Sequence, residues 1–70
     1  MYYKDYHAFI HHSTTADMYF GRVNNIKHTE ITFSALTIPE LKTSFINAID
    51  AYINDCAVAD KFPEVPFELN

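Results

Sequence analysis

The longest regular pattern in the chain is a stripe of apolar residues between Thr37 and about Asp60, a stretch with no Gly and with Pro only near its start. The apolar positions recur at intervals of three and four, as on one face of a helix: Ile38, Leu41, Phe45, Ala48, Ile49, Tyr52, Cys56 and Ala59. Thr37 with Glu40 three residues later forms a capping box, and Pro39 fits the first turn. The sequence therefore predicts one long amphipathic helix.

Three stretches before the helix alternate with the period of a β-strand: residues 2–12, 18–23 and 29–35. Polar clusters at 13–17 and 24–28 indicate turns between them. Because the connections are short, the pattern predicts an α+β fold of order β-β-β-α. It is a three-stranded antiparallel meander with one long helix packed on one face.

The alternation also assigns side chains to the two faces of the sheet. The inner face receives Tyr6, Ala8, Ile10, Tyr19, Gly21, Val23, Ile31, Phe33 and Ala35. Gly21, the only glycine, is expected there to let the helix approach the sheet closely. The outer face receives Asp5, His7, His11, Arg22 and Glu30 together with the large apolar residues Tyr3, Phe9, Met18 and Phe20. These apolar side chains could form cross-strand pairs, but an uncovered patch of this size favours contact with a partner.

The predicted helix is about 33 Å long, whereas a strand of six or seven residues covers about 20–23 Å. The far end of the apolar stripe, around Tyr52, Cys56 and Ala59, therefore needs another cover. The tail 62–67 is expected to fold back over part of it in an extended conformation, because it contains two prolines. A chain of 70 residues with a single cysteine cannot add an internal disulfide, so we expect a homodimer or a higher homo-oligomer.

The charges divide the chain unevenly. Residues 1–39 contain three acids and three bases, whereas residues 40–70 contain six acids and two bases and carry the whole net charge of −4. An acidic chain without a basic patch is a poor candidate for binding phosphates and a better one for meeting a basic protein. No apolar run is long enough for a signal peptide or a membrane span, so we expect a cytoplasmic protein.

Candidate metal ligands and catalytic groups do not converge in the sequence. His7 and His11 lie about 13 Å apart on a strand, and His11 and His12 face opposite sides; His28 lies in the second turn. Cys56 falls in the apolar stripe and is interpreted as a buried small hydrophobe. We therefore expect no metal, no cofactor and no catalytic residue.

Three acids, Asp50, Asp55 and Asp60, lie in the C-terminal half of the predicted helix. The helix dipole disfavours a negative charge in the last turn by about 0.3–1 kcal/mol. One interpretation is a solvated helix face. The other is that local stability is given up to present negative charge to a basic partner.

Short motifs in a fixed order span nearly the whole chain: Tyr3-Lys4-Asp5-Tyr6, Phe20-Gly21-Arg22-Val23, Thr32-Phe33-Ser34-Ala35, Thr37-Ile38-Pro39-Glu40-Leu41, Phe45, Ala48-Ile49-Asp50-Ala51-Tyr52, Cys56 and Pro63-Glu64-Val65-Pro66-Phe67. In their order and spacing the chain resembles the N-terminal domain of HicB-family antitoxins, the inhibitory half of bacterial HicA–HicB toxin–antitoxin pairs. It departs from the family pattern at Asp5 and Ala35, where glycine is common, and at its end, where Glu68-Leu69-Asn70 replaces the usual serine-glycine.

The resemblance implies a partial ribonuclease-H-like fold, a β-β-β-α unit with a further short strand that we place in the C-terminal tail, and no nuclease activity. Members of the family bind a small basic toxin that has a double-stranded-RNA-binding-like fold and cleaves messenger RNA, and they cover its catalytic surface. Many also carry a C-terminal segment that binds operator DNA. No such segment is recognisable here, so we expect one HicB-like domain, residues 1–70, without direct DNA binding.

We therefore expect an antitoxin-like inhibitory protein that binds a HicA-like toxin. The candidate partner-binding residues are Phe9, Phe20, Arg22, Asp50, Asp55, Asp60, Phe62, Glu64 and Phe67. The acids would supply long-range attraction and the aromatic side chains apolar contact. Two other interpretations stay open: a stand-alone RNA- or nucleic-acid-binding module that stacks bases on the exposed aromatics, and a nuclease inferred from fold analogy alone.

Overall fold

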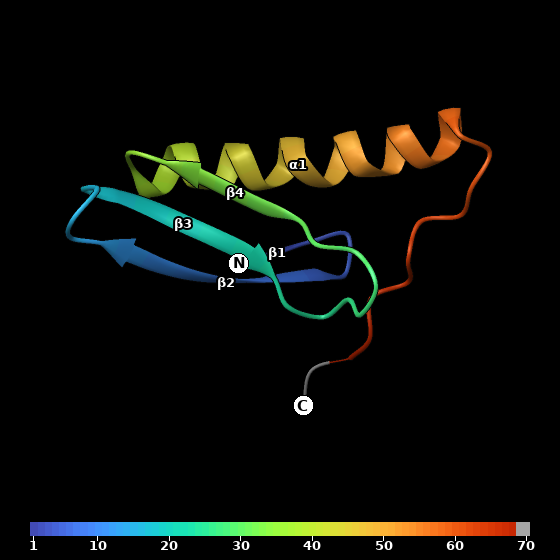
Figure 1. Ribbon diagram of the computed structural model, residues 1–70, viewed down its shortest axis with the longest axis horizontal. Helices are drawn as coiled ribbons and strands as arrows, with labels where there is room; N and C mark the ends of the chain where they lie inside the picture. Colours follow the sequence, from blue (N-terminus) through green and yellow to red (C-terminus); the bar gives the residue numbers. More distant parts are fainter. Residues whose placement is uncertain (69–70) are drawn as a thin grey trace.

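The computed structural model describes residues 1–68; Leu69 and Asn70, which end the predicted domain, lie outside the described residues. Its elements are β1 (Tyr2–Tyr3), β2 (Tyr6–Ser13), β3 (Met18–Val23), β4 (Thr32–Ala35) and α1 (Ile38–Val58). The strands form one antiparallel sheet in the order β1-β2-β3-β4, and α1 lies along one side of it (Figure 1). The predicted α+β fold, an antiparallel meander with one long helix, is confirmed.

The start of α1 shows one half of the predicted capping box, the bond to the Thr37 hydroxyl. Thr37 is the N-cap, and its hydroxyl accepts a hydrogen bond from the Glu40 backbone N–H at 3.3 Å. Pro39 lies in the first turn, where a missing N–H leaves no helical bond unmade. The helix therefore begins at the residue that its local sequence indicates.

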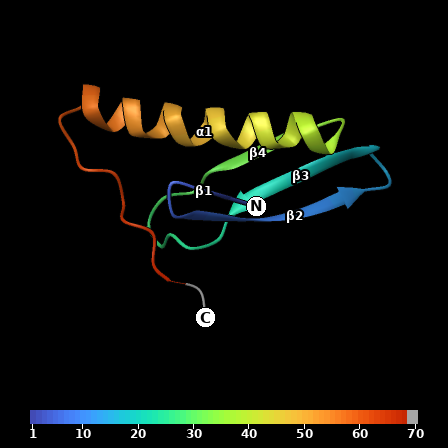
Figure 2. The same ribbon diagram turned by 180° about the vertical axis from the view of Figure 1, so that it is seen from behind.

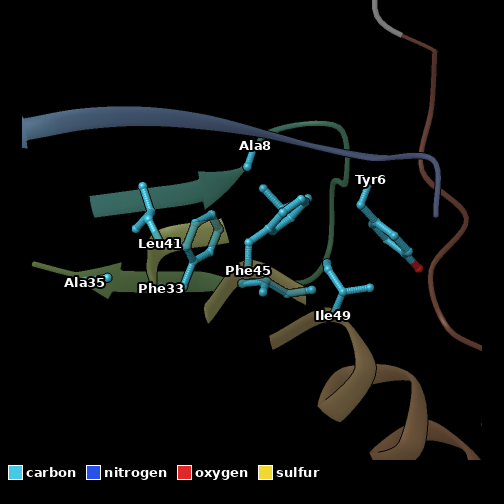
Figure 3. Close-up of a cluster of buried hydrophobic side chains, with 9 residues drawn as sticks. Tyr6, Ala8, Phe33, Ala35, Leu41, Phe45 and Ile49 are labelled. Carbon is cyan, nitrogen blue, oxygen red and sulfur yellow. The ribbon is translucent and has the colours of Figure 1, made fainter. Parts of the chain in front are cut away.

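The core lies between α1 and the inner face of the sheet (Figure 3). From the helix it contains Leu41, Phe45 and Ile49, and from the strands and connections Tyr6, Ala8, Val23, Ile31, Phe33 and Ala35. Phe45 is central, because its ring centroid lies 5.0 Å from that of Phe33 and 6.4 Å from that of Tyr3. Most of the stability of α1 comes from burying this stripe, since helices in folded proteins are stabilised mainly by packing of their apolar face.

Gly21 makes room for one ring of this core. It lies opposite Phe33 in the β3–β4 ladder, and a Cβ atom at position 21 would lie 2.3 Å from the Phe33 ring. The space that the glycine leaves is thus taken by a cross-strand ring, which in turn packs on Phe45. The prediction that Gly21 leaves room for the helix is therefore wrong, because the neighbour that needs the space is Phe33 on β4.

The prediction of one continuous first strand is wrong, because the chain reverses direction at Lys4 and Asp5. Both residues have a left-handed backbone conformation, with φ of 50° and 70°, and they form a two-residue hairpin turn. Tyr3 therefore lies opposite Tyr6 and on the helix side of the sheet, not on the outer face as predicted. Asp5 lies in the turn and not on a strand face. The fourth strand of the sheet is thus β1, whereas residues 61–68 of the tail contain no strand.

β4 is shorter than the predicted strand 29–35. The backbone N–H groups of Lys27 and His28 both bind the Glu64 carboxylate, so the chain there bends toward the tail instead of extending the strand. Ile31 is nevertheless buried, and its carbonyl accepts a hydrogen bond from the Val23 N–H at 3.0 Å. The third predicted strand therefore keeps its inner face but loses its first three residues.

The helix is longer than the strands on which it packs, as predicted from the sequence. α1 has 21 residues, or about 32 Å, and it packs chiefly on β4 and less on β3. Its C-terminal half extends past the strands, and the tail then turns back toward the β2 end of the molecule (Figures 1 and 2).

Replacing Gly21 with alanine should destabilise the protein by about 1–3 kcal/mol, because the new methyl group overlaps the Phe33 ring. Urea denaturation followed by circular dichroism measures this loss. Ser34→Ala, on the exposed face of the neighbouring strand, is the control and should stay within about 0.5 kcal/mol of the wild type. An unchanged midpoint for Gly21→Ala would show that the ring has room to move.

Candidate functional site

Eight of the nine residues expected to bind a partner fall on two surfaces, and the ninth, Asp50, lies within α1. Phe9, Phe20 and Arg22 lie on the outer sheet face, the side opposite α1. Five others lie at the C-terminal end of α1 and in the tail: Asp55, Asp60, Phe62, Glu64 and Phe67. The structure therefore does not bring all of the predicted residues into one site.

A hollow opens where α1 extends beyond the sheet, and we call it the helix-end hollow. It is lined by His28, Thr29, Tyr52, Asp55, Cys56, Ala59, Lys61, Phe62 and Glu64. Tyr52 and Cys56, from the far end of the apolar stripe, are only half-buried in it, and Phe62 is 99% exposed. The tail thus covers the stripe in part, and an apolar surface next to Asp55 stays open.

Glu64 fastens the tail to the rest of the molecule through all three of its polar groups. Its carboxylate accepts the backbone N–H groups of Lys27 and His28, the latter at 3.0 Å. Its own N–H donates to the Tyr52 hydroxyl at 2.8 Å, and its carbonyl accepts the Tyr6 hydroxyl at 2.8 Å. We call these contacts the tail latch. The Glu64 charge, expected to attract a partner, is occupied within the chain.

These contacts shift the pKa values of two groups, Glu64 and Tyr6. The pKa of the Glu64 carboxyl lies below its ordinary value, chiefly because the Lys27 backbone N–H binds its ionised form. The pKa of Tyr6 is raised, mainly by burial. Both shifts follow from the packing of the tail against the core.

Asn25 is the polar centre of the latch region, and the sequence pattern identified it only as a turn residue. It is 1% exposed. Its side-chain carbonyl accepts the His7 N–H at 2.9 Å, and its amide donates to the backbone carbonyls of Asp5 at 2.9 Å and Phe67 at 3.1 Å. Asn25 therefore ties the N-terminal hairpin turn to the tail, a role that only the folded chain reveals.

Phe67 is held by the same asparagine. Its backbone N–H donates to the Asn25 carbonyl at 2.9 Å, and the Lys27 ammonium lies 5.7 Å from the centre of its ring. The ring is 39% exposed. Phe67 thus contributes to the attachment of the tail and presents only part of its ring to solvent.

Asp50 is paired within the chain. Its carboxylate lies 3.0 Å from the Lys4 ammonium and accepts the Tyr3 hydroxyl at 3.0 Å. The hydrogen bond from Lys4 lowers the pKa of Asp50, and the same bond raises the pKa of Lys4. Of Asp50, Asp55 and Asp60, the last of which follows the end of α1 at Val58, Asp50 therefore has the least charge to offer a partner.

Asp60 occupies the position where a helix commonly ends in glycine. The Lys61 N–H bonds to the Cys56 carbonyl and the Asp60 N–H to the Ala57 carbonyl, which is a Schellman motif. Asp60 is left-handed, with φ of 56°. An aspartate there costs stability twice, through its backbone and through the helix dipole. The local structure alone does not favour this residue.

The outer sheet face is uncovered by the helix. Phe9 is 64% exposed and lies opposite Arg22, and Phe20 stacks on His11 with ring centroids 5.6 Å apart. An open hollow there is lined by Phe9, His11, Ser13, Phe20, Gly21, Arg22, Thr32, Phe33 and Ser34. No carboxylate is among these lining residues, in contrast to the acidic end of α1.

Within residues 1–68 no three His, Cys, Asp or Glu side chains come close enough together to hold a metal ion. α1, the helix of residues 1–68, does not combine the length and the apolar character needed to cross a bilayer. Comparison of the chain with protein-family models, curated proteins and solved structures finds no match.

Glu64→Gln should lower the stability of the protein at neutral pH and reduce the loss of stability between pH 7 and pH 3. Because the folded-state pKa of Glu64 is depressed, its stabilising contribution is present above the ordinary glutamate value of 4.5 and is lost as the pH falls through the lowered value. Thermal unfolding between pH 7 and pH 3 measures the difference between variant and wild type.

Glu30→Gln, at an exposed glutamate outside the tail latch, is the matched control and should keep the wild-type pH dependence. If Glu64→Gln also keeps it, the carboxylate does not hold the tail.

Proposed function

We propose that this chain is a HicB-like antitoxin domain, which neutralises a small, basic, RNA-cleaving HicA-like toxin by covering its active surface. The order of motifs along the chain and the four-stranded sheet with one long helix support this proposal. In it the chain is cytoplasmic, has no catalytic role of its own and needs no cofactor or DNA-binding segment.

The observation that carries the proposal is the combination of charge and open apolar surface at the end of α1. Asp55 lines the helix-end hollow, Asp60 follows the helix, and the fully exposed Phe62 ring stands beside them. A basic protein would gain electrostatic attraction from the acids and bury apolar area in the hollow. The unfavourable placement of an aspartate at position 60 is explained if its charge attracts a partner.

The same arrangement distinguishes the acids. Asp50 is bonded to Lys4 and Tyr3, and Glu64 belongs to the tail latch. Asp55 and Asp60 are exposed side chains without such roles. Long-range attraction of a partner is therefore assigned to Asp55 and Asp60.

Self-association is assigned to the outer sheet face. Its exposed Phe9 and half-exposed Phe20 form an apolar surface that α1 does not reach. Two such faces could pack sheet on sheet in a homodimer. The toxin and a second copy would then occupy different sides of the molecule.

A stand-alone RNA-binding module is the alternative. The stacked His11 and Phe20 rings beside Arg22, on a face whose hollow has no carboxylate, favour it. The scarcity of lysine and arginine in the chain argues against it. A filter-binding titration with single-stranded RNA at low salt separates the two functions, because only the alternative requires saturable binding.

Co-elution with a HicA-like toxin at micromolar concentration and low salt is the direct test. Asp55→Lys should slow association by about tenfold with less change in dissociation, because the charge steers the encounter. Stopped-flow fluorescence or surface plasmon resonance measures both rates.

Asp17→Lys changes the net charge by the same amount as Asp55→Lys. Asp17 lies in the turn between β2 and β3, far along the chain from the end of α1. It is the matched control and should change the association rate much less. Separate elution of the two proteins contradicts the proposal, and equal effects of the two variants contradict the site.

A further inference from the structure

β4 is an edge strand with unpaired backbone groups. The Ile31 carbonyl accepts the Val23 N–H, so in the alternating antiparallel ladder the groups of residues 31, 33 and 35 face β3. The N–H and C=O groups of Thr32 and Ser34 point to the free side. No strand of residues 1–68 pairs with that side, and both residues are exposed.

α1 packs on the inner face of β4 and β3. Its C-terminal half leads toward the β1–β2 hairpin at the other edge of the sheet, where Asp50 bonds to Tyr3 and Lys4 and the Tyr52 ring packs on that of Tyr6. A strand added at β4 would lie about 4.8 Å further out, so it would widen the sheet on the side away from that hairpin.

The chemistry of this edge is distinctive. Residues 31–39 form the longest stretch of the chain without any ionisable side chain, so no lysine or other charge blocks strand addition. Acids flank this stretch in the sequence: Glu30 directly before it and Glu40, in the first turn of α1, directly after it. Asp55 lines the helix-end hollow together with Thr29, close to the start of β4. An extended segment that carries lysine or arginine complements this frame.

A second copy of the chain is disfavoured at this edge, because it would bring another net charge of −4 to a stretch flanked by Glu30 and Glu40.

We propose that the free edge of β4 accepts an extended basic segment of the partner protein by β-strand addition. This inference rests on the proposed function, since the basic partner proposed there supplies the segment. Backbone hydrogen bonds from Thr32 and Ser34 give the affinity, and the acids that flank this stretch give the charge preference.

Amide hydrogen exchange measured by nuclear magnetic resonance tests the inference on the native sequence. Addition of the HicA-like toxin should slow exchange of the Thr32 and Ser34 amides at least tenfold. The amides of Ile10 and His12 are the internal control: they face the open side of β2, because the neighbouring Ala8 N–H points to Met1. Their exchange should not change.

Ser34→Pro removes one of the free edge N–H groups and no bond to β3, so an edge strand tolerates it. It should weaken toxin binding at least tenfold, whereas Ser34→Ala, which keeps the N–H, should stay within twofold. If Ser34→Pro does not fold, the exchange measurement on the native chain decides.

A complex that forms without slower exchange at Thr32 and Ser34 overturns this inference and leaves the proposed function standing. Failure of the toxin to bind overturns the proposed function. The edge is then probed with an acetylated six-residue peptide of alternating lysine and valine, and with its glutamate counterpart. Slower exchange with the lysine peptide alone supports strand addition, and no change with either peptide overturns it.

Discussion

The structure depends on the packing of one 21-residue helix against a sheet too short to cover it. Leu41, Phe45 and Ile49 are completely buried and join the helix to the inner face of the sheet. Beyond Ile49 the apolar stripe continues, but the strands do not. The molecule must therefore complete its core at the C-terminal end of α1 by other means, and the path of the tail and the helix-end hollow both follow from this mismatch.

The tail solves only part of the problem, and it does so with polar contacts. Glu64 and Asn25 hold it by backbone and side-chain hydrogen bonds, while the large apolar side chains of Phe62 and Val65 remain almost fully exposed. Such a latch fixes the path of the chain without adding much apolar burial. The proposal of a basic partner rests on this combination of an acidic helix end and uncovered apolar surface.

The sequence predicted the helix, its N-cap and the buried centre of the apolar stripe because these depend on local spacing and on one strong periodicity, whereas the ends of the stripe, Ile38 and Ala59, are exposed. It could not predict the reversal at Lys4 and Asp5, since neither residue type favours the left-handed conformation as glycine does. That turn moved Tyr3 from the outer to the inner face. The sequence identified the site residues as exposed acids and aromatics, but it could not identify the groups within the chain to which they bond. The bonds of Asp50 to Lys4 and of Glu64 to residues 27 and 28 join segments far apart in the chain.

Hydrogen exchange along α1 in the free protein tests the mismatch most directly. The account predicts that amides around Phe45 and Ile49 exchange only through global unfolding, whereas those from Ile53 to Val58 exchange much faster through local opening of the uncovered end. A gradient of at least a hundredfold between the two halves of the helix is the expected result. Equal, strong protection along the whole of α1 would contradict the claim that the sheet leaves the helix incomplete.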